Sequence, residues 1–203
     1  MDTEKGHNKF SYEHQAEEAG EEKEPRPEYA EEVERAFMGA VNHELNQSLA
    51  VISGMAQVIE NSLREGEAKE RIKEIISQAF EIAEIIKPKI HYSAGRLKDG
   101  EAPALERAAQ EEKDNFMRKM ALALADKIEQ RLTAIEENLS LNFSDEDKNS
   151  RLGIKNDIEF ITEGVASAKN IASRIRSAKH YRTKPYVSGA LIVDFDKAIE
   201  PED

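Results

Sequence analysis

The sequence predicts an all-α protein in which two tandem αα-hairpins form a four-helix bundle, followed by a short C-terminal extended segment. Three observations support this prediction. Apolar residues recur at helical spacing in four stretches, charged residues make up 34% of the chain, and aromatic residues make up only 6%. This composition favours helices that pack through aliphatic seams over a β-sandwich or a β-barrel.

The first hairpin is expected over residues 30–92. Its first helix contains a heptad seam with one polar member, Ser48. The seam consists of Val41, Leu45, Ser48, Ile52, Met55 and Ile59. Gly66 interrupts the pattern, and a second apolar face then continues to Pro88, a residue type that ends or kinks a helix. Two amphipathic helices joined by a short loop make a helical hairpin.

The second hairpin, over residues 113–183, repeats this organisation. Segments 45–52 and 128–135 align at an offset of 83 residues, so that Gln47 recurs as Gln130, and a His-Tyr pair follows the second helix of each hairpin. We interpret the recurrence as an internal duplication. One hairpin has an exposed apolar face, which a second hairpin can cover. Either one chain forms the bundle as a monomeric pseudo-dimer, or two chains pair as a homodimer.

Three polar stretches surround the two hairpins. Residues 1–29 hold nine acidic and four basic side chains and are predicted to be a disordered acidic tail. Residues 93–112, with two glycines and a proline, are predicted to be a linker. Residues 184–203 form a linker-like C-terminal tail that includes Y-V-S-G-A-L-I-V-D-F, the one stretch with the composition of a strand.

Charge and composition exclude several classes of function. The net charge of −12 disfavours binding to nucleic acid or to an anionic membrane surface, because like charges repel. The chain contains no cysteine, which excludes disulfides and thiolate metal sites. It also has no run of about 18 apolar residues that could span a bilayer. We therefore expect a cytoplasmic protein.

His43 is the main candidate for chemistry. It lies two residues after Val41 and two before Leu45, off the seam, so we expect it to face outward beside Glu44. An exposed imidazole is a competent nucleophile near neutral pH, and a neighbouring carboxylate can orient it or accept its proton. The metalloprotease motif H-E-x-x-H is excluded because position 47 is Gln. The other histidines are expected to be solvated or to act as helix C-terminal charges: His7, His14, His91 and His180.

The segment F-M-G-A-V-N-H-E-L-N-Q-S-L-A-V-I-S-G, residues 37–54, resembles the H-box of sensor histidine kinases. That box belongs to their dimerisation and histidine-phosphotransfer (DHp, or HisKA) domain, and the closest branch reads H-E-[LI]-N-Q-P-L. The similarity covers about residues 30–92. The second hairpin, from A-L-A-D-K-I-E-Q-R-L-T-A-I at 123–135 onward, resembles a degenerate copy of the same domain. Residues 184–198 resemble the linker that leads into the ATP-binding domain.

The resemblance implies a histidine-kinase-like phosphotransfer module of a two-component system. His43 would be the phosphoacceptor, and Glu44 would be its acid–base partner. Gln47 would orient water or the phosphoaspartate of a response regulator. The expected partners are a receiver domain and a histidine kinase. No cofactor of its own is expected, because the Mg²⁺ that neutralises charge would belong to the receiver domain.

Three departures from the family lead to alternative interpretations. Ser48 replaces the proline of this branch, and Asp126 and Lys127 stand where the second copy would have His and Glu. No glycine-rich ATP-binding motif is present, so we expect no autokinase activity and at most a phosphotransferase. The alternatives are a non-catalytic adaptor or inhibitor that binds a kinase or a response regulator, or a fragment of a longer sensor histidine kinase.

Overall fold

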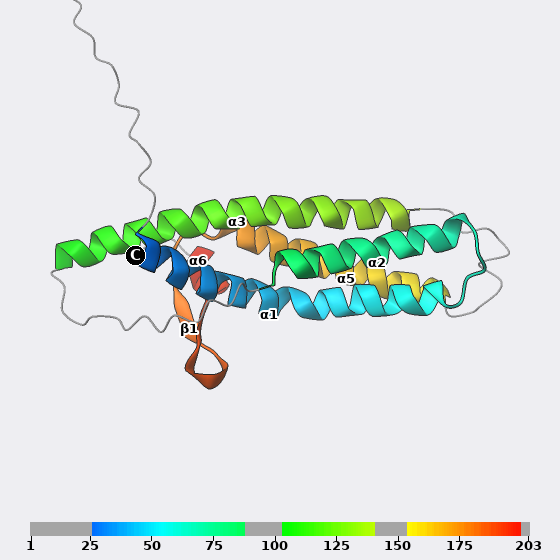
Figure 1. The fold of residues 1–203 in the computed structure, drawn as a ribbon, viewed down its shortest axis with the longest axis horizontal. Helices are drawn as coiled ribbons and strands as arrows, with labels where there is room; N and C mark the ends of the chain where they lie inside the picture. The colour runs from blue at the N-terminus through cyan, green and yellow to red at the C-terminus, as the bar shows by residue number, and fades with distance from the viewer. Residues whose placement is uncertain (1–25, 88–102, 141–153, 200–203) are drawn as a thin grey trace, which may run out of the picture.

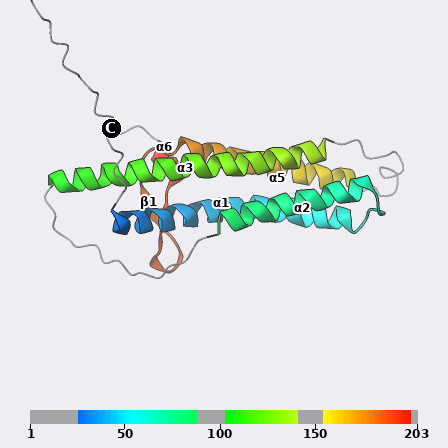
Figure 2. The same ribbon diagram turned by 45° about the horizontal axis from the view of Figure 1, so that its top comes forward.

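Four long helices dominate the computed structural model, which describes residues 26–87, 103–140 and 154–199. They are α1 (Pro27–Glu60), α2 (Glu67–Ile85), α3 (Pro103–Leu139) and α5 (Ile154–Ser177). Figure 1 shows them running alongside one another, and the turned view in Figure 2 shows the same grouping. The predicted all-α fold is confirmed.

The two hairpins pack against each other within one chain. Helix α1 contacts both α2 and α5, and α3 contacts the same two helices. Each of the two longest helices therefore lies between the two shorter ones, and the four close into a bundle. Each hairpin covers the apolar face that the other would otherwise expose to water.

The heptad seam of α1 lies in the core, as its spacing predicts. Leu45, Ile52 and Ile59 are fully buried, and the polar member Ser48 is only 6% exposed. The apolar faces of the other three helices meet this seam. Their fully buried members include Ile72, Ile75, Ile82, Met117, Ile128, Leu132, Ile161 and Ile175. Complete burial of an aliphatic side chain of this size stabilises a fold by about 1.5–3 kcal/mol before entropy is counted.

Two helices begin earlier than the sequence indicated. Residues 103–112, which were predicted to be linker, form the first turns of α3, and α1 begins at Pro27 inside the predicted tail. Both helices start with a proline, because the first helical residue needs no N–H donor and proline presets the helical φ. The residues after Pro103, A-L-E-R-A-A-Q, are strong helix formers. Residues 1–25 and 93–102 of the predicted tail and linker lie outside the described residues.

The predicted extended segment forms a small hairpin and a short helix. Strand β1 (Thr183–Pro185) pairs antiparallel with β2 (Leu191–Val193), and the 3₁₀ turn η1 (Val187–Gly189) joins them. Helix α6 (Phe195–Ile199) comes next. Figure 1 shows the hairpin projecting from the bundle beside α1. This segment is therefore part of the fold and not only a linker.

The C-terminal segment is attached to α1 by apolar contacts. Ile192, Val193 and Phe195 are buried, and the ring of Phe195 meets that of Phe37 edge-on, with centroids 5.8 Å apart. Gly39 lets β2 approach α1 closely, since a Cβ at this position would lie 3.2 Å from Cγ2 of Ile192. These contacts place the hairpin on the half of α1 that leads to His43.

Candidate functional site

His43 is exposed on α1, where its position off the seam predicts it. Its imidazole contacts Tyr186 of the C-terminal hairpin, 143 residues away in the chain. The Tyr186 hydroxyl oxygen lies 3.1 Å from Nδ1 of His43. The two ring centroids are 5.0 Å apart and the ring planes meet at 60°. Tyr186 thus contacts His43 both through a hydrogen bond and through its ring edge.

The hairpin holds Tyr186 in this position through its own backbone. The Tyr186 N–H donates to the carbonyl of Ala190 at 2.7 Å, which closes the turn. At the base of the hairpin, Nζ of Lys184 lies 3.3 Å from Oδ1 of Asp194. Sequence reasoning missed Tyr186. It could identify the strand-like segment but not the helix on which that segment packs.

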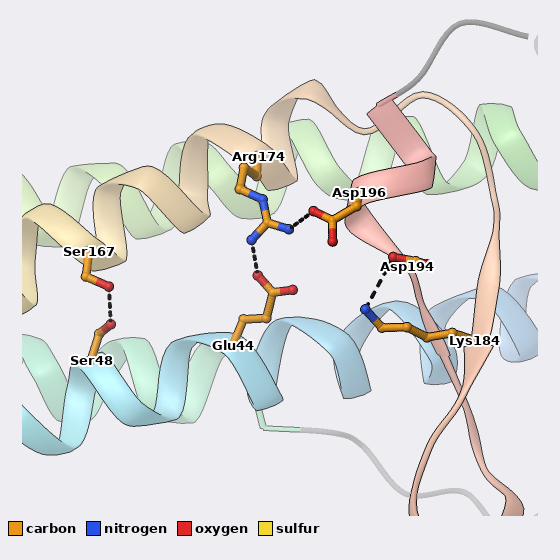
Figure 3. A network of polar contacts seen from close by, with 7 residues as sticks. All are labelled: Glu44, Ser48, Ser167, Arg174, Lys184, Asp194 and Asp196. Atoms are coloured by element: carbon orange, nitrogen blue, oxygen red, sulfur yellow. Dashed lines mark hydrogen bonds and ion pairs between the residues drawn. The ribbon is translucent and has the colours of Figure 1, made fainter.

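Glu44 turns away from His43 and toward α5. Its Oε2 accepts a hydrogen bond from Arg174 at 2.7 Å, and the same guanidinium donates to Oδ1 of Asp196 on α6 at 2.6 Å (Figure 3). The Glu44 side chain is 19% exposed and that of Arg174 is 32% exposed. The carboxylate that the resemblance makes the acid–base partner of His43 is therefore paired with a cation on another helix.

Gln47 is exposed one helical turn after His43. Residues four apart lie on the same face of an α-helix, so the amide and the imidazole face the same side of α1. Of the three predicted site residues, His43 and Gln47 thus share an open surface, whereas Glu44 belongs to the contact between α1 and α5.

Ser48 is the polar member of the buried seam, and its hydroxyl has a partner. Its Oγ donates to Oγ of Ser167 on α5 at 3.0 Å, as Figure 3 shows. Helix α1 continues without interruption from Pro27 to Glu60. The serine is thus accommodated inside a regular helix, at the position where the H-box that this segment resembles has a proline.

The equivalent region of the second hairpin is occupied by ion pairs. Asp126 stands at the position that aligns with His43, and its Oδ1 accepts a hydrogen bond from Arg176 at 2.6 Å. Arg176 also donates a hydrogen bond to Glu129. The hydrogen bond with Glu129 is the larger cause, and that with Asp126 the next, of a guanidinium pKa above its usual value. Arg174 of α5 therefore binds an acid on α1, and Arg176 of α5 binds two acids on α3.

His180, which was expected to be solvated or to act as a helix C-terminal charge, lies just beyond the end of α5 and contacts an acidic side chain. Its Nδ1 lies 3.2 Å from Oδ2 of Asp114, a buried aspartate on α3. Asp114 also accepts from the backbone N–H of Tyr181 at 2.6 Å and from the side-chain amide of Gln110 at 2.7 Å. This cluster joins the chain beyond α5 to α3. His7, His14 and His91 lie outside the described residues.

Two further searches concern only the part of the chain that the structure describes. No three His, Asp or Glu side chains there come together in a way that could hold a metal ion. None of the helices described combines the length and the apolar character needed to cross a membrane.

Comparisons of the chain with protein-family models, with curated proteins and with solved structures gave no significant match. The resemblance to the phosphotransfer domain of histidine kinases therefore depends on the H-box residues 37–54 and on the similarities in the second hairpin and the C-terminal segment.

Proposed function

We propose that this protein is a phosphotransfer module of two-component signalling that acts in the cytoplasm. His43 exchanges a phosphoryl group with an aspartate of a response-regulator receiver domain. The observation that carries the proposal is an exposed imidazole within H-E-L-N-Q on the first helix of a four-helix bundle. An imidazole in this position is accessible to a partner that docks from solvent.

The reaction is a reversible displacement at phosphorus. A ring nitrogen of neutral His43 attacks the phosphorus of the receiver's aspartyl phosphate. The N–P bond forms as the P–O bond to the aspartate breaks, and the aspartate leaves as a carboxylate. Mg²⁺ held by the receiver domain would neutralise charge on the phosphoryl oxygens. His43 then carries the phosphoryl group until the reverse reaction or hydrolysis removes it.

Gln47 and Glu44 have different parts in this proposal. Gln47, on the same face as His43, is placed to contact the incoming phosphoryl group or the partner. Glu44 can accept the imidazole proton only if it releases Arg174, to which it is bound at 2.7 Å. Its pairing therefore supports a role in holding α5 against α1 more than a role in proton transfer.

A non-catalytic adaptor is the second candidate, and two observations favour it. Tyr186 contacts the nitrogen Nδ1 of His43, and Ser48 replaces the proline that the related kinases have below their histidine. An adaptor would use the same surface to bind a kinase or a receiver domain without accepting phosphate.

Phosphate mapping distinguishes the two candidates. The full chain is incubated with phosphoramidate, and separately with a phosphorylated receiver domain and Mg²⁺, and acid-labile phosphate is mapped by mass spectrometry. We expect label on His43 of the wild type and of a His180→Gln control, and none in His43→Gln. The proposal is contradicted if His43 stays unlabelled while a phosphotransfer protein of known activity is labelled in parallel. Receiver binding that persists in His43→Ala without any label would favour the adaptor.

A further inference from the structure

We propose that Tyr186 is a positioning residue that sets the tautomer of His43 and, while the two side chains are in contact, occupies the lone pair that would attack phosphorus. The hydroxyl of Tyr186 donates to Nδ1, so that the ring proton resides on Nε2. The contact on which this rests joins the two side chains at 3.1 Å. Its consequence for phosphotransfer rests on the proposed function, whereas the tautomer itself does not.

The direction of the hydrogen bond is set by the acidities of the two groups. A phenol, with an ordinary pKa of about 10, is a far better donor than the N–H of a neutral imidazole. An unprotonated imidazole nitrogen, whose conjugate acid has a pKa of about 6.5, is the better acceptor. Between neutral side chains the favoured arrangement is therefore O–H of Tyr186 donating to Nδ1 of His43.

This arrangement leaves His43 without a free lone pair. A neutral imidazole has a proton on one nitrogen and a lone pair on the other. The lone pair of Nδ1 accepts the hydrogen bond from Tyr186, and Nε2 carries the proton. When the contact breaks, the lone pair of Nδ1 is free to form the N–P bond. Exchange through water can also move the one ring proton from Nε2 to Nδ1 with no net change in charge, which frees the lone pair of Nε2 instead.

The tip of the hairpin is suited to being displaced by a partner. Tyr186, Val187 and Leu191 are 40%, 69% and 49% exposed. The base is firmly held, since Val193 and Phe195 are almost completely buried. Each strand has only three residues, so few backbone hydrogen bonds oppose movement of the tip. A receiver domain that docks over His43 would meet this exposed apolar tip, and its binding would supply the energy that separates Tyr186 from Nδ1.

Tyr186→Phe tests the tautomer directly. The full chain is labelled with ¹⁵N, and the ring nitrogens of His43 are observed by NMR at pH 8.5, where imidazole is ordinarily neutral. We expect the Nε2–H tautomer to dominate in the wild type. In Tyr186→Phe the Nδ1–H share should rise, with the ratio changing about twofold to tenfold, as loss of one hydrogen bond predicts. Val187→Ala, in the same turn but without the hydroxyl, is the matched control and should leave the ratio unchanged. An equal ratio in wild type and Tyr186→Phe, or a proton on Nδ1 in the wild type, would overturn the inference.

Labelling by phosphoramidate tests the consequence of the tautomer. The rate of label formation on His43 should rise by a similar factor in Tyr186→Phe and stay at the wild-type value in Val187→Ala. Equal or lower rates in Tyr186→Phe would refute the inhibitory role and leave the proposed function standing. If the tautomer ratio shifts but neither protein is ever labelled, the Tyr186 assignment holds and the phosphotransfer function fails.

Discussion

The hydroxyl groups of Ser48 and Ser167 lie 3.0 Å apart and join α1 to α5 at a partly buried contact between the two helices. Ser48 is a polar residue in the buried apolar seam and is only 6% exposed. Its hydroxyl has therefore lost most of its contact with water. The hydrogen bond to Ser167 offsets that loss. This pair makes a regular helix compatible with a polar residue at the position where the H-box that this segment resembles has a proline.

We expect Ser48→Pro to destabilise the protein by about 3 kcal/mol or more, because proline removes a helical N–H and clashes with the preceding turn. Ser48→Ala should cost only about 0.5–1.5 kcal/mol, the value of one hydrogen bond. Urea denaturation followed by circular dichroism measures both. Equal stability of wild type and Ser48→Pro would show that α1 tolerates a proline at this position.

Gly164 and Gly54 should respond in opposite directions to alanine. A Cβ at Gly164 would lie 3.0 Å from Cγ1 of Ile52, whereas nothing lies within 4 Å of a Cβ at Gly54. Gly54→Ala should therefore stabilise the protein by about 0.5–1 kcal/mol through helix propensity. In Gly164→Ala the overpacking cost of about 1–3 kcal/mol should outweigh that gain. Thermal denaturation of both variants checks the prediction, and a stabilised Gly164→Ala would mean that α1 and α5 lie further apart.

Arg174 should contribute measurably to stability because it binds acids on two other elements. Loss of its pairs with Glu44 and Asp196 in Arg174→Gln should cost about 1 kcal/mol, discounted for the exposure of all three side chains. Lys87→Gln removes an exposed pair with Glu84 and is the control, expected within about 0.5 kcal/mol of wild type. The Arg174→Gln effect should shrink in 1 M NaCl, because salt screens charges. An effect no larger than that of Lys87→Gln would argue against the Glu44–Arg174–Asp196 contact in solution.

Tyr181 should make the protein sensitive to alkaline pH. Burial, and next the nearby carboxylate of Glu32, raise the pKa of Tyr181 well above its ordinary value of about 10. A group whose pKa is higher in the folded state contributes stability that is complete below the unfolded-state pKa. That contribution is lost as pH rises from about 10 toward the folded-state pKa.

We therefore expect the wild type to lose stability faster than Tyr181→Phe above about pH 10, by up to about 1.4 kcal/mol per pH unit. Urea denaturation at pH 9, 10 and 11 provides the comparison. At pH 9 the Phe variant should be slightly less stable, because it lacks the 3.3 Å contact between the Tyr181 hydroxyl and Glu32. Parallel curves for the two proteins above pH 10 would contradict the assigned cause.

The prolines show where sequence reasoning was limited. Pro27 and Pro103 lie within the predicted tail and linker, yet each is the first residue of a long helix. Proline breaks a helix in its interior but is favoured at its first position, so its effect depends on whether the residues after it form a helix. The alanine-rich stretch after Pro103 indicates a helix. The two glycines before Pro103 favoured the prediction of a linker instead.

The sequence by itself determined the four helices, the buried seam containing Ser48 and the outward position of His43, because these depend on spacing within one helix. Only the tertiary structure decided the partners of the site residues. Tyr186 reaches His43 across 143 residues, and Arg174 reaches Glu44 across 130. Such contacts depend on how the two hairpins and the C-terminal strands pack together. No periodicity within a single helix records that packing.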